Sequence, residues 1–151
     1  KCEMNIELSN LTDSKCDLER LKSIAQFTIL AQGVHPDSEL NISLLDDEEM
    51  SALHLRWMQE DGPTDVLAFP MDEVKPNSAT LGPAMLGDIA LCPNYANKNA
   101  IKVHSSLQDE LELLIVHGVL HLLGYDHLEA DQREVMFALQ DRYLVEWRAK
   151  R

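Results

Sequence analysis

The sequence has few cysteines and no apolar run long enough to cross a membrane. Its three cysteines, Cys2, Cys16 and Cys92, are an odd number without CxxC spacing, which argues against a disulfide framework and against a thiolate metal site. The longest nearly uncharged apolar stretch, residues 113–125, is too short for a spanning helix and contains two histidines. No signal-peptide pattern opens the chain. We therefore expect a protein of the reducing cytoplasm.

Basic residues are also scarce. Only 13 Lys and Arg stand against 26 Asp and Glu, a formal net charge of −13. This balance disfavours non-specific binding to nucleic acid or to an anionic membrane. Residues 89–108 depart from it, because they contain no acidic residue and include Lys98, Lys102 and His104. A local basic face is thus compatible with an acidic protein.

Length and composition predict one folded domain over residues 1–151. The chain has 151 residues, of which 45% are hydrophobic and 26% charged, and a domain of this size buries roughly 70% of the surface of its unfolded chain. Periodicity predicts strands over residues 4–8, 40–44, 63–70 and 87–91, and helices over 18–32, 46–58 and 129–148, with a short helix after Pro93 and a long loop over 72–85. This order favours an α+β fold with about four strands, packed mainly on one face against helices.

A long apolar helix is predicted after Ser105, which with Gln108 fits a capping box. Because this helix is apolar nearly all round, we expect it in the middle of the domain. It carries His117 and His121, which lie four residues apart and so share a face. Gly124 then ends the helix and lets the chain turn back toward it.

The turn after Gly124 would bring His127 close to His117 and His121. Three imidazole ligands with a fourth position open to water are typical of catalytic zinc. Two histidines would be costly to bury in an apolar helix without partners, so we favour a metal site over a purely structural role. One Zn²⁺ per chain is the predicted cofactor, although imidazoles also bind other divalent transition metals.

The spacing HxxxHxxxxxH is also that of the metzincin proteases. Those enzymes carry a glutamate directly after the first histidine as general base, and Gly118 stands there instead. Peptide hydrolysis by that route is therefore disfavoured. Asp126, directly before His127, is expected to bond local backbone amides rather than to act on a substrate.

The segment HGVLHLLGYDH at residues 117–127 resembles the signature of the YbeY endoribonucleases at every defined position. The similarity extends to GPTDVLAFP at 62–70, LGDI at 86–89, HS at 104–105 and EL at 110–111. The resemblance implies an α+β fold and a metal, usually zinc, bound by His117, His121 and His127. It also implies a single-strand-specific endoribonuclease that acts in ribosomal RNA maturation and ribosome quality control, with the small ribosomal subunit or its proteins as partners.

The sequence departs from the family pattern at one position. Many members carry an arginine five residues before the proline of the Pro-Thr-Asp motif, and here that position is Met58. Arg56 is the nearest cation, and we assign it as the candidate catalytic residue. On a continuous helix it points about 200° away from Met58, so either the backbone changes there, or the chain manages without this group and Arg56 is a solvated surface residue.

The other polar candidates have weaker support. Thr64 and Asp65 suit either a cleft wall or the start of a strand, and His104 is expected beside the cap of the next helix. His35 and His54 are expected in a turn and on an exposed helix. Two further functions stay open: a metallohydrolase of another class, such as a peptidase, and a non-enzymatic ribosome-associated protein with a structural ion. No membrane partner is expected.

Overall fold

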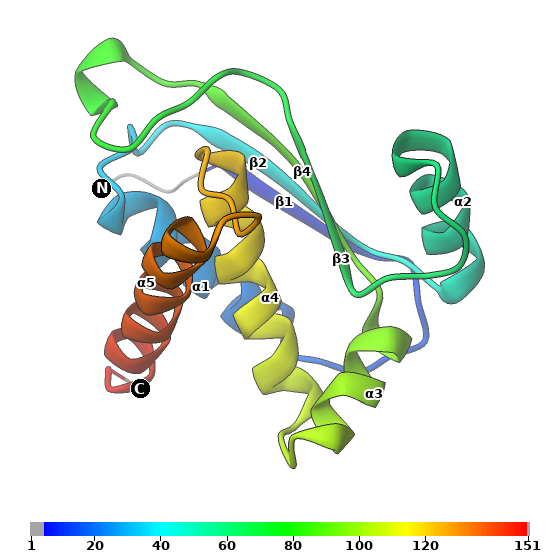
Figure 1. Cartoon of the computed structure of the whole chain (residues 1–151). Helices are drawn as coiled ribbons and strands as arrows, with labels where there is room; N and C mark the ends of the chain where they lie inside the picture. Colours follow the sequence, from blue (N-terminus) through cyan, green and yellow to red (C-terminus); the bar gives the residue numbers. More distant parts are fainter. Residues whose placement is uncertain (1–4, 151) are drawn as a thin grey trace.

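The computed structural model describes residues 5–150, which form a four-stranded sheet packed with helices (Figure 1). The elements follow in the order β1 (Asn5–Asn10), α1 (Leu18–Ala31), β2 (Glu39–Leu44), α2 (Asp47–Met58), β3 (Val66–Pro70), η1 (Ala79–Leu81), β4 (Met85–Leu91), α3 (Pro93–Lys102), α4 (Leu107–Leu122) and α5 (Ala130–Arg148). The predicted α+β fold is confirmed. Met4, which was assigned to the first strand, lies outside the described residues. None of the helices in residues 5–150 meets the length and apolarity that crossing a membrane requires.

The sheet is mixed, with the strand order β1-β2-β4-β3. The β1–β2 and β2–β4 pairs are parallel, and β3 joins the edge of β4 in antiparallel register. Parallel neighbours need crossover connections, which α1 supplies between the first two strands. Pro70 ends the edge strand, where a missing N–H is tolerated.

The strand bounds differ from the predicted ones at two places. The third strand begins at Val66 rather than at Pro63, because Asp65 turns the chain there: its side chain accepts a hydrogen bond from the Val66 amide at 2.8 Å. The fourth strand begins at Met85, two residues earlier than predicted. The pairing with β2 shifts register so that Leu86 has no partner there, next to Gly87, whose φ is 140°. This irregularity hides the strand's first residues from a periodicity argument.

The main core lies on one face of the sheet, where α1, α4 and α5 pack (Figure 1). Helix α4 contacts α1, α3, α5, β3 and β4, so its predicted central place is confirmed. Helix α5 packs inward through an apolar stripe: Met136, Tyr143 and Trp147 are buried and Leu139 packs against the core.

Helix α2 covers the opposite face through a smaller core. Successive residues of β3 alternate between the two cores, with Val66 and Ala68 in the main one and Leu67 and Phe69 in the smaller one. Cys92 is fully buried in the smaller core.

Two hydrogen bonds connect the start of α2 to the end of β4. The Cys92 thiol and the Asn94 amide donate to the Asp47 carboxylate at 3.1 and 2.8 Å. These bonds lower the pKa of Asp47 below its ordinary value. Burial raises the pKa of Cys92 to about 11, so its thiol stays protonated.

The predicted cap of α4 is wrong by one residue. Ser106, not Ser105, is the N-cap, and its hydroxyl accepts from the Asp109 amide at 3.0 Å. The Ser105 amide instead donates to Ala100 at the end of α3. Gln108 does not close a capping box, because its side chain bonds the backbone ahead of α1.

His54 is not the exposed helical residue that was predicted. Only 13% of its side chain is exposed, and its Nδ1 lies 2.9 Å from the Gly62 carbonyl oxygen. This contact holds the chain after α2 against the helix. His35 lies in a turn as predicted, where its Nδ1 accepts from the Asp37 amide at 3.0 Å.

Candidate metal centre

Helix α4 presents two histidines on one face, one turn apart. His117 is half-buried and His121 is exposed. Gly118, the residue after His117, is buried where α4 packs against the sheet. A Cβ added at Gly118 would lie 3.0 Å from the Ile89 side chain, so glycine lets α4 approach β4 closely. A glutamate at this position would point into the core, and it could not serve as the general base of a metzincin-like site.

The turn after α4 carries the third histidine back toward the first. Gly124 has a φ of +100°, a left-handed conformation that glycine adopts without strain. The Asp126 carboxylate accepts from the amides of His127 and Leu128 at 2.7 and 3.3 Å. Asp126 thus has the structural role that was predicted. The ring centroids of His117 and His127 are 5.3 Å apart.

A hydrogen bond across the core fixes the orientation of the His117 ring. Its Nδ1 lies 3.0 Å from Oε1 of Gln140, a buried residue of α5. Because this carbonyl oxygen can only accept, Nδ1 carries the proton and donates, and the lone pair is left on Nε2. Neutral imidazole with one nitrogen held by an acceptor is the form in which histidine binds metals.

The surroundings of His117 favour this neutral form. Burial lowers the pKa of His117 below its usual range, and the nearby rings of His127 and His121 lower it further, against the opposing effect of the Gln140 hydrogen bond. Sequence reasoning missed Gln140. The available signal was a polar residue within the otherwise apolar inner face of α5.

The structure brings the rings of His117 and His127 together. His121 lies one turn after His117 on α4. His121 lines a hollow with Pro70 and Met71 at the end of β3. Within residues 5–150, no group of three or more His, Cys, Asp or Glu side chains already converges as an ion would require. The metal site at His117, His121 and His127 therefore stays a prediction.

Two carboxylates lie near the histidine face of α4. Asp65 accepts from the Asn99 amide at 3.2 Å, and its charge favours protonated His117. Glu110 lies two helical turns before His117. Burial, and secondarily the charge of Asp65, raise the pKa of Glu110. Asp65 thus directly precedes β3 and also contributes negative charge near His117. His104 is exposed, two residues before the helix cap, as predicted.

No change in the backbone of α2 brings Arg56 to the place of Met58. Helix α2 continues through Met58, and only Gln59 adopts a left-handed conformation, with φ 57°. The Arg56 guanidinium is exposed and lies 5.2 Å from the centre of the Trp57 ring. No described contact joins Arg56 to the histidines, so its catalytic role stays a prediction.

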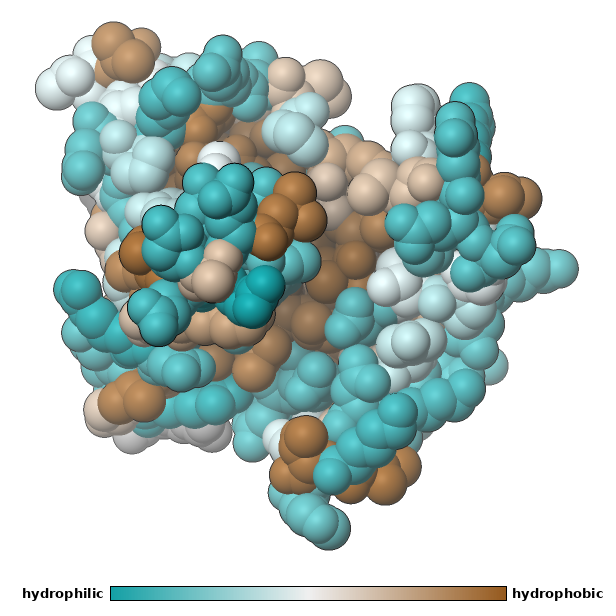
Figure 2. All heavy atoms as spheres, viewed as in Figure 1, coloured by the Kyte–Doolittle hydropathy of each residue, from teal (hydrophilic) through white to brown (hydrophobic). Residues whose placement is uncertain are grey.

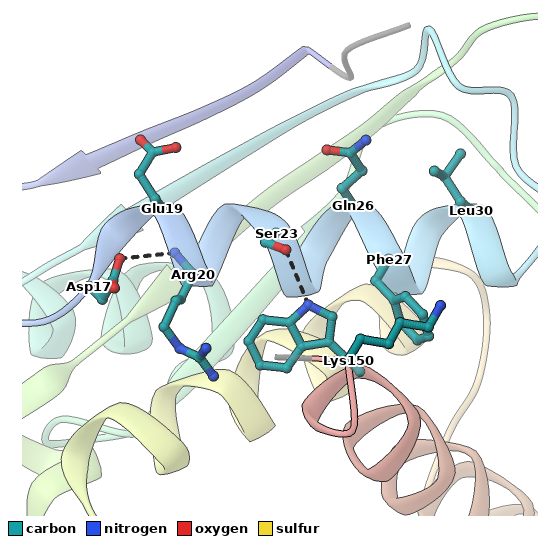
Figure 3. A pocket seen from close by; sticks show the side chains of 9 residues that line it. Asp17, Glu19, Arg20, Ser23, Gln26, Phe27, Leu30 and Lys150 are labelled. Atoms are coloured by element: carbon teal, nitrogen blue, oxygen red, sulfur yellow. Dashed lines mark hydrogen bonds between the residues drawn. The ribbon is translucent and has the colours of Figure 1, made fainter. Parts of the chain in front are cut away.

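A separate hollow of about 580 Å³ lies between α1 and the end of α5 (Figure 3). It is lined by Phe27, Arg20 and Lys150, among others, and holds no histidine. The Arg20 Nε lies 3.0 Å from Glu112 and its Cζ lies 4.4 Å from the centre of the Trp147 ring, whereas its Nη2 is buried without a hydrogen-bond partner among the described residues. The side chains that line this hollow therefore connect α1 to α4 and α5, and we do not assign the hollow a reaction.

Fold and site together define a small α+β protein whose central helix presents two histidines one turn apart, next to an edge strand. The family model described as Endoribonuclease YbeY matches residues 5–148. Proteins named Endoribonuclease YbeY from Thermobifida fusca and Mycolicibacterium smegmatis are 48% and 52% identical to this chain, over 96% and 95% of it and 95% and 83% of their own lengths.

The fold is also similar to the solution structure of TM1509 from Thermotoga maritima. The TM-score is 0.66 at 29% identity, and the match covers 96% of this chain and 93% of that one. The chain belongs to the Endoribonuclease YbeY family.

Proposed function

We propose that this protein is a metal-dependent, single-strand-specific endoribonuclease of the cytoplasm that acts in ribosomal RNA maturation and ribosome quality control. Family membership supports the reaction class. The observation that carries the metal site is the approach of His117 and His127, at 5.3 Å, beside a helix on which His121 lies one turn further along.

The residues present fit a zinc ion. His117 offers Nε2, because Gln140 holds its Nδ1 proton. His121 and His127 are exposed, so their side chains can rotate toward His117 without repacking the core. When bound by three imidazoles, zinc would supply Lewis-acid activation of water and neutralisation of phosphate charge. Nickel, copper or iron would suit the same donors.

The remaining polar groups divide the other tasks. Gln140 orients one ligand, and Asp126 holds the turn that carries another. Asp65 and Glu110 border the histidine face, and burial raises the pKa of Glu110 above its ordinary value. Since no carboxylate base follows the first histidine, either the bound ion would activate water by itself or the RNA 2′-hydroxyl is the nucleophile. A 2′,3′-cyclic phosphate on the product would identify the 2′-hydroxyl.

The acidic composition bears on the partner. With a formal charge of −13, the protein should bind free RNA weakly and cleave it productively when docked to the small ribosomal subunit or one of its proteins. The affinity for RNA should then vary little with salt, because few phosphates are contacted. A steep dependence of affinity on salt would contradict this part of the proposal.

The structure favours catalysis over the two alternatives. A metzincin-like peptidase is disfavoured by the packing of Gly118 on Ile89. A purely structural ion would be needed to hold the last two helices to the body. Here Tyr143 and Arg148 of α5 already bond α1 and α4 through Gln32 and Glu112, so these helices are held without an ion.

The test combines elemental analysis with cleavage assays. Wild type and His121→Ala are compared for bound metal and for activity on single-stranded RNA and on casein, with His35→Ala as the control outside the site. We expect about one ion per wild-type chain, RNA cleavage only by wild type and the control, and no casein cleavage. Metal-free protein that keeps its full RNA activity, or His121→Ala with unchanged activity, would refute the proposal.

Chelation separates a catalytic from a structural ion. Removal of a catalytic ion from a preformed core should abolish cleavage and lower the melting temperature little, whereas a structural ion contributes folding energy directly. A large loss of stability on chelation, with activity following only the unfolding, would favour the structural alternative.

A further inference from the structure

The end of α2 carries an exposed tryptophan that the core does not need. Trp57 is 58% exposed, and Leu55 on the same helix is 54% exposed. Neither side chain belongs to the smaller core beneath α2, which Met50 and Leu53 of this helix serve. Scattered exposed apolar residues are ordinary, so exposure alone indicates nothing; the contacts of the ring carry the argument.

Two contacts hold the Trp57 ring in place. Its edge packs on Phe69 of β3, with ring centroids 6.2 Å apart and planes inclined by 60°. The Arg56 guanidinium lies 5.2 Å from the ring centre. The ring is therefore oriented by its neighbours while more than half of its residue surface is open to solvent. Arg56 adds a positive charge beside an aromatic face.

The Trp57 ring contacts β3, the edge strand whose end also forms one wall of the hollow that contains His121. Phe69 contacts Trp57, and the next two residues, Pro70 and Met71, line the hollow that contains His121. In the space-filling view, an apolar hollow lies between α2 and the segment that joins α4 to α5 (Figure 2). A chain crossing β3 from the histidines would thus reach α2.

We propose that Trp57, together with Arg56, forms a stacking platform for one unpaired base of the RNA substrate. The proposal rests on the endoribonuclease function proposed above and names where the substrate binds. Stacking on an aromatic ring accepts any base and is available only to unpaired ones, and arginine strengthens it through cation–π attraction.

The charge of the molecule agrees with stacking as the main source of affinity. Glu60 and Asp61 follow α2 directly, so phosphates find little general attraction there. A protein partner is the less suitable occupant, because stable interfaces bury about 800 Å² per partner around an apolar centre. Here the Arg56 guanidinium lies directly beside the exposed ring.

The test measures the binding of a fluorescent single-stranded oligoribonucleotide in a His121→Ala background, where cleavage is removed. We expect Trp57→Ala to weaken binding by about 5- to 150-fold, the equivalent of one stacked base, and Trp57→Phe to restore most of it. Leu55→Ala is the matched control, because it removes an equally exposed apolar side chain of the same helix. A duplex of the same sequence should not respond to Trp57→Ala.

Three results would overturn the platform. Trp57→Ala could bind the oligonucleotide as tightly as its parent. Leu55→Ala could weaken binding equally, with lowered melting temperatures in both, which would assign the effect to helix stability. Trp57→Ala could lose binding to ribosomal protein alone, which would make the ring a protein contact. If wild type cleaves RNA while Trp57→Ala keeps its affinity, only the platform fails; if wild type neither binds nor cleaves RNA, the proposed function fails with it.

Discussion

Replacing Glu112 by glutamine should destabilise the fold more than any single surface change. The Glu112 side chain is fully buried in the middle of α4. One carboxylate oxygen accepts from Arg20 Nε at 3.0 Å and from Gln108 at 3.1 Å, and the other accepts from Arg148 at 3.1 Å. This carboxylate thus joins α1, α4 and α5.

The magnitude follows from what the amide cannot do. Glutamine keeps the shape, but its NH₂ group faces an arginine. Arg20 loses its counter-charge, whereas Arg148 keeps the Asp109 carboxylate at 3.7 Å. Removing one partner of a fully buried pair costs about 3–5 kcal/mol. The side chains of Arg20 and Arg148 are 26% and 29% exposed, so water recovers part of this. We expect Glu112→Gln to lower the free energy of unfolding by about 2–4 kcal/mol, and the melting temperature by about 4–16 °C.

The assay is urea unfolding followed by circular dichroism, at low salt and at high salt. The control is Glu146→Gln, since Glu146 pairs with Arg142 on the surface of α5 with 47% and 64% of their side chains exposed, and such pairs contribute under about 0.5 kcal/mol. The cost of Glu112→Gln should persist at high salt, because buried charges are poorly screened. Equal costs for the two variants, or a cost that high salt removes, would refute the reasoning.

Three further predictions test the strand, the helix start and the histidine orientation. Gly87→Ala should unfold the protein or cost several kcal/mol, because its Cβ would lie 2.1 Å from a backbone oxygen of β3; Gly62→Ala, also at positive φ but in open space, should cost about 1 kcal/mol, and equal melting temperatures would contradict this. Because the folded pKa of Asp47 is lowered from 3.8, its stabilisation is complete above the unfolded pKa and is lost as pH falls below about 4; the stability difference between wild type and Asp47→Asn should shrink there, and a constant difference down to pH 2 would disprove it. Gln140→Leu should remove the hydrogen bond that keeps the His117 proton on Nδ1, so that ¹⁵N NMR of metal-free protein shows a changed tautomer population. It should also weaken zinc binding by about 10- to 100-fold in chelator competition. An unchanged tautomer would show that Gln140 does not orient the ring.

Much of the fold could be predicted because periodicity reports burial directly. The apolar α4 was placed at the centre, and the alternation at Leu40 and Ile42 gave a strand with those residues buried. The errors arose where a side chain redirects the backbone. Asp65 delays the third strand, a register shift at Leu86 disturbs the start of the fourth, and Ser106 rather than Ser105 caps α4. Local hydrogen bonds decide such bounds, and hydropathy does not contain them.

The candidate site was predictable where its residues are close in sequence. The i, i+4 spacing of His117 and His121 and the glycine before His127 depend only on helix geometry and on the conformational freedom of glycine. The groups around them are remote in sequence: Gln140 comes from the last helix, and Asp65 from the start of an edge strand. A polar residue on an apolar helix face marks Gln140, and the Pro-Thr-Asp motif marks Asp65, but neither segment shows that these residues lie near His117.

From the sequence by itself, one can derive the element order, the central apolar helix, the three histidines and the displaced arginine. Only the tertiary structure determines that Gly118 faces Ile89, that Gln140 bonds His117, and that the Trp57 ring packs against Phe69. The physical reason is that local periodicity determines which face of an element is buried. Which partner meets that face depends on how the elements pack around the sheet.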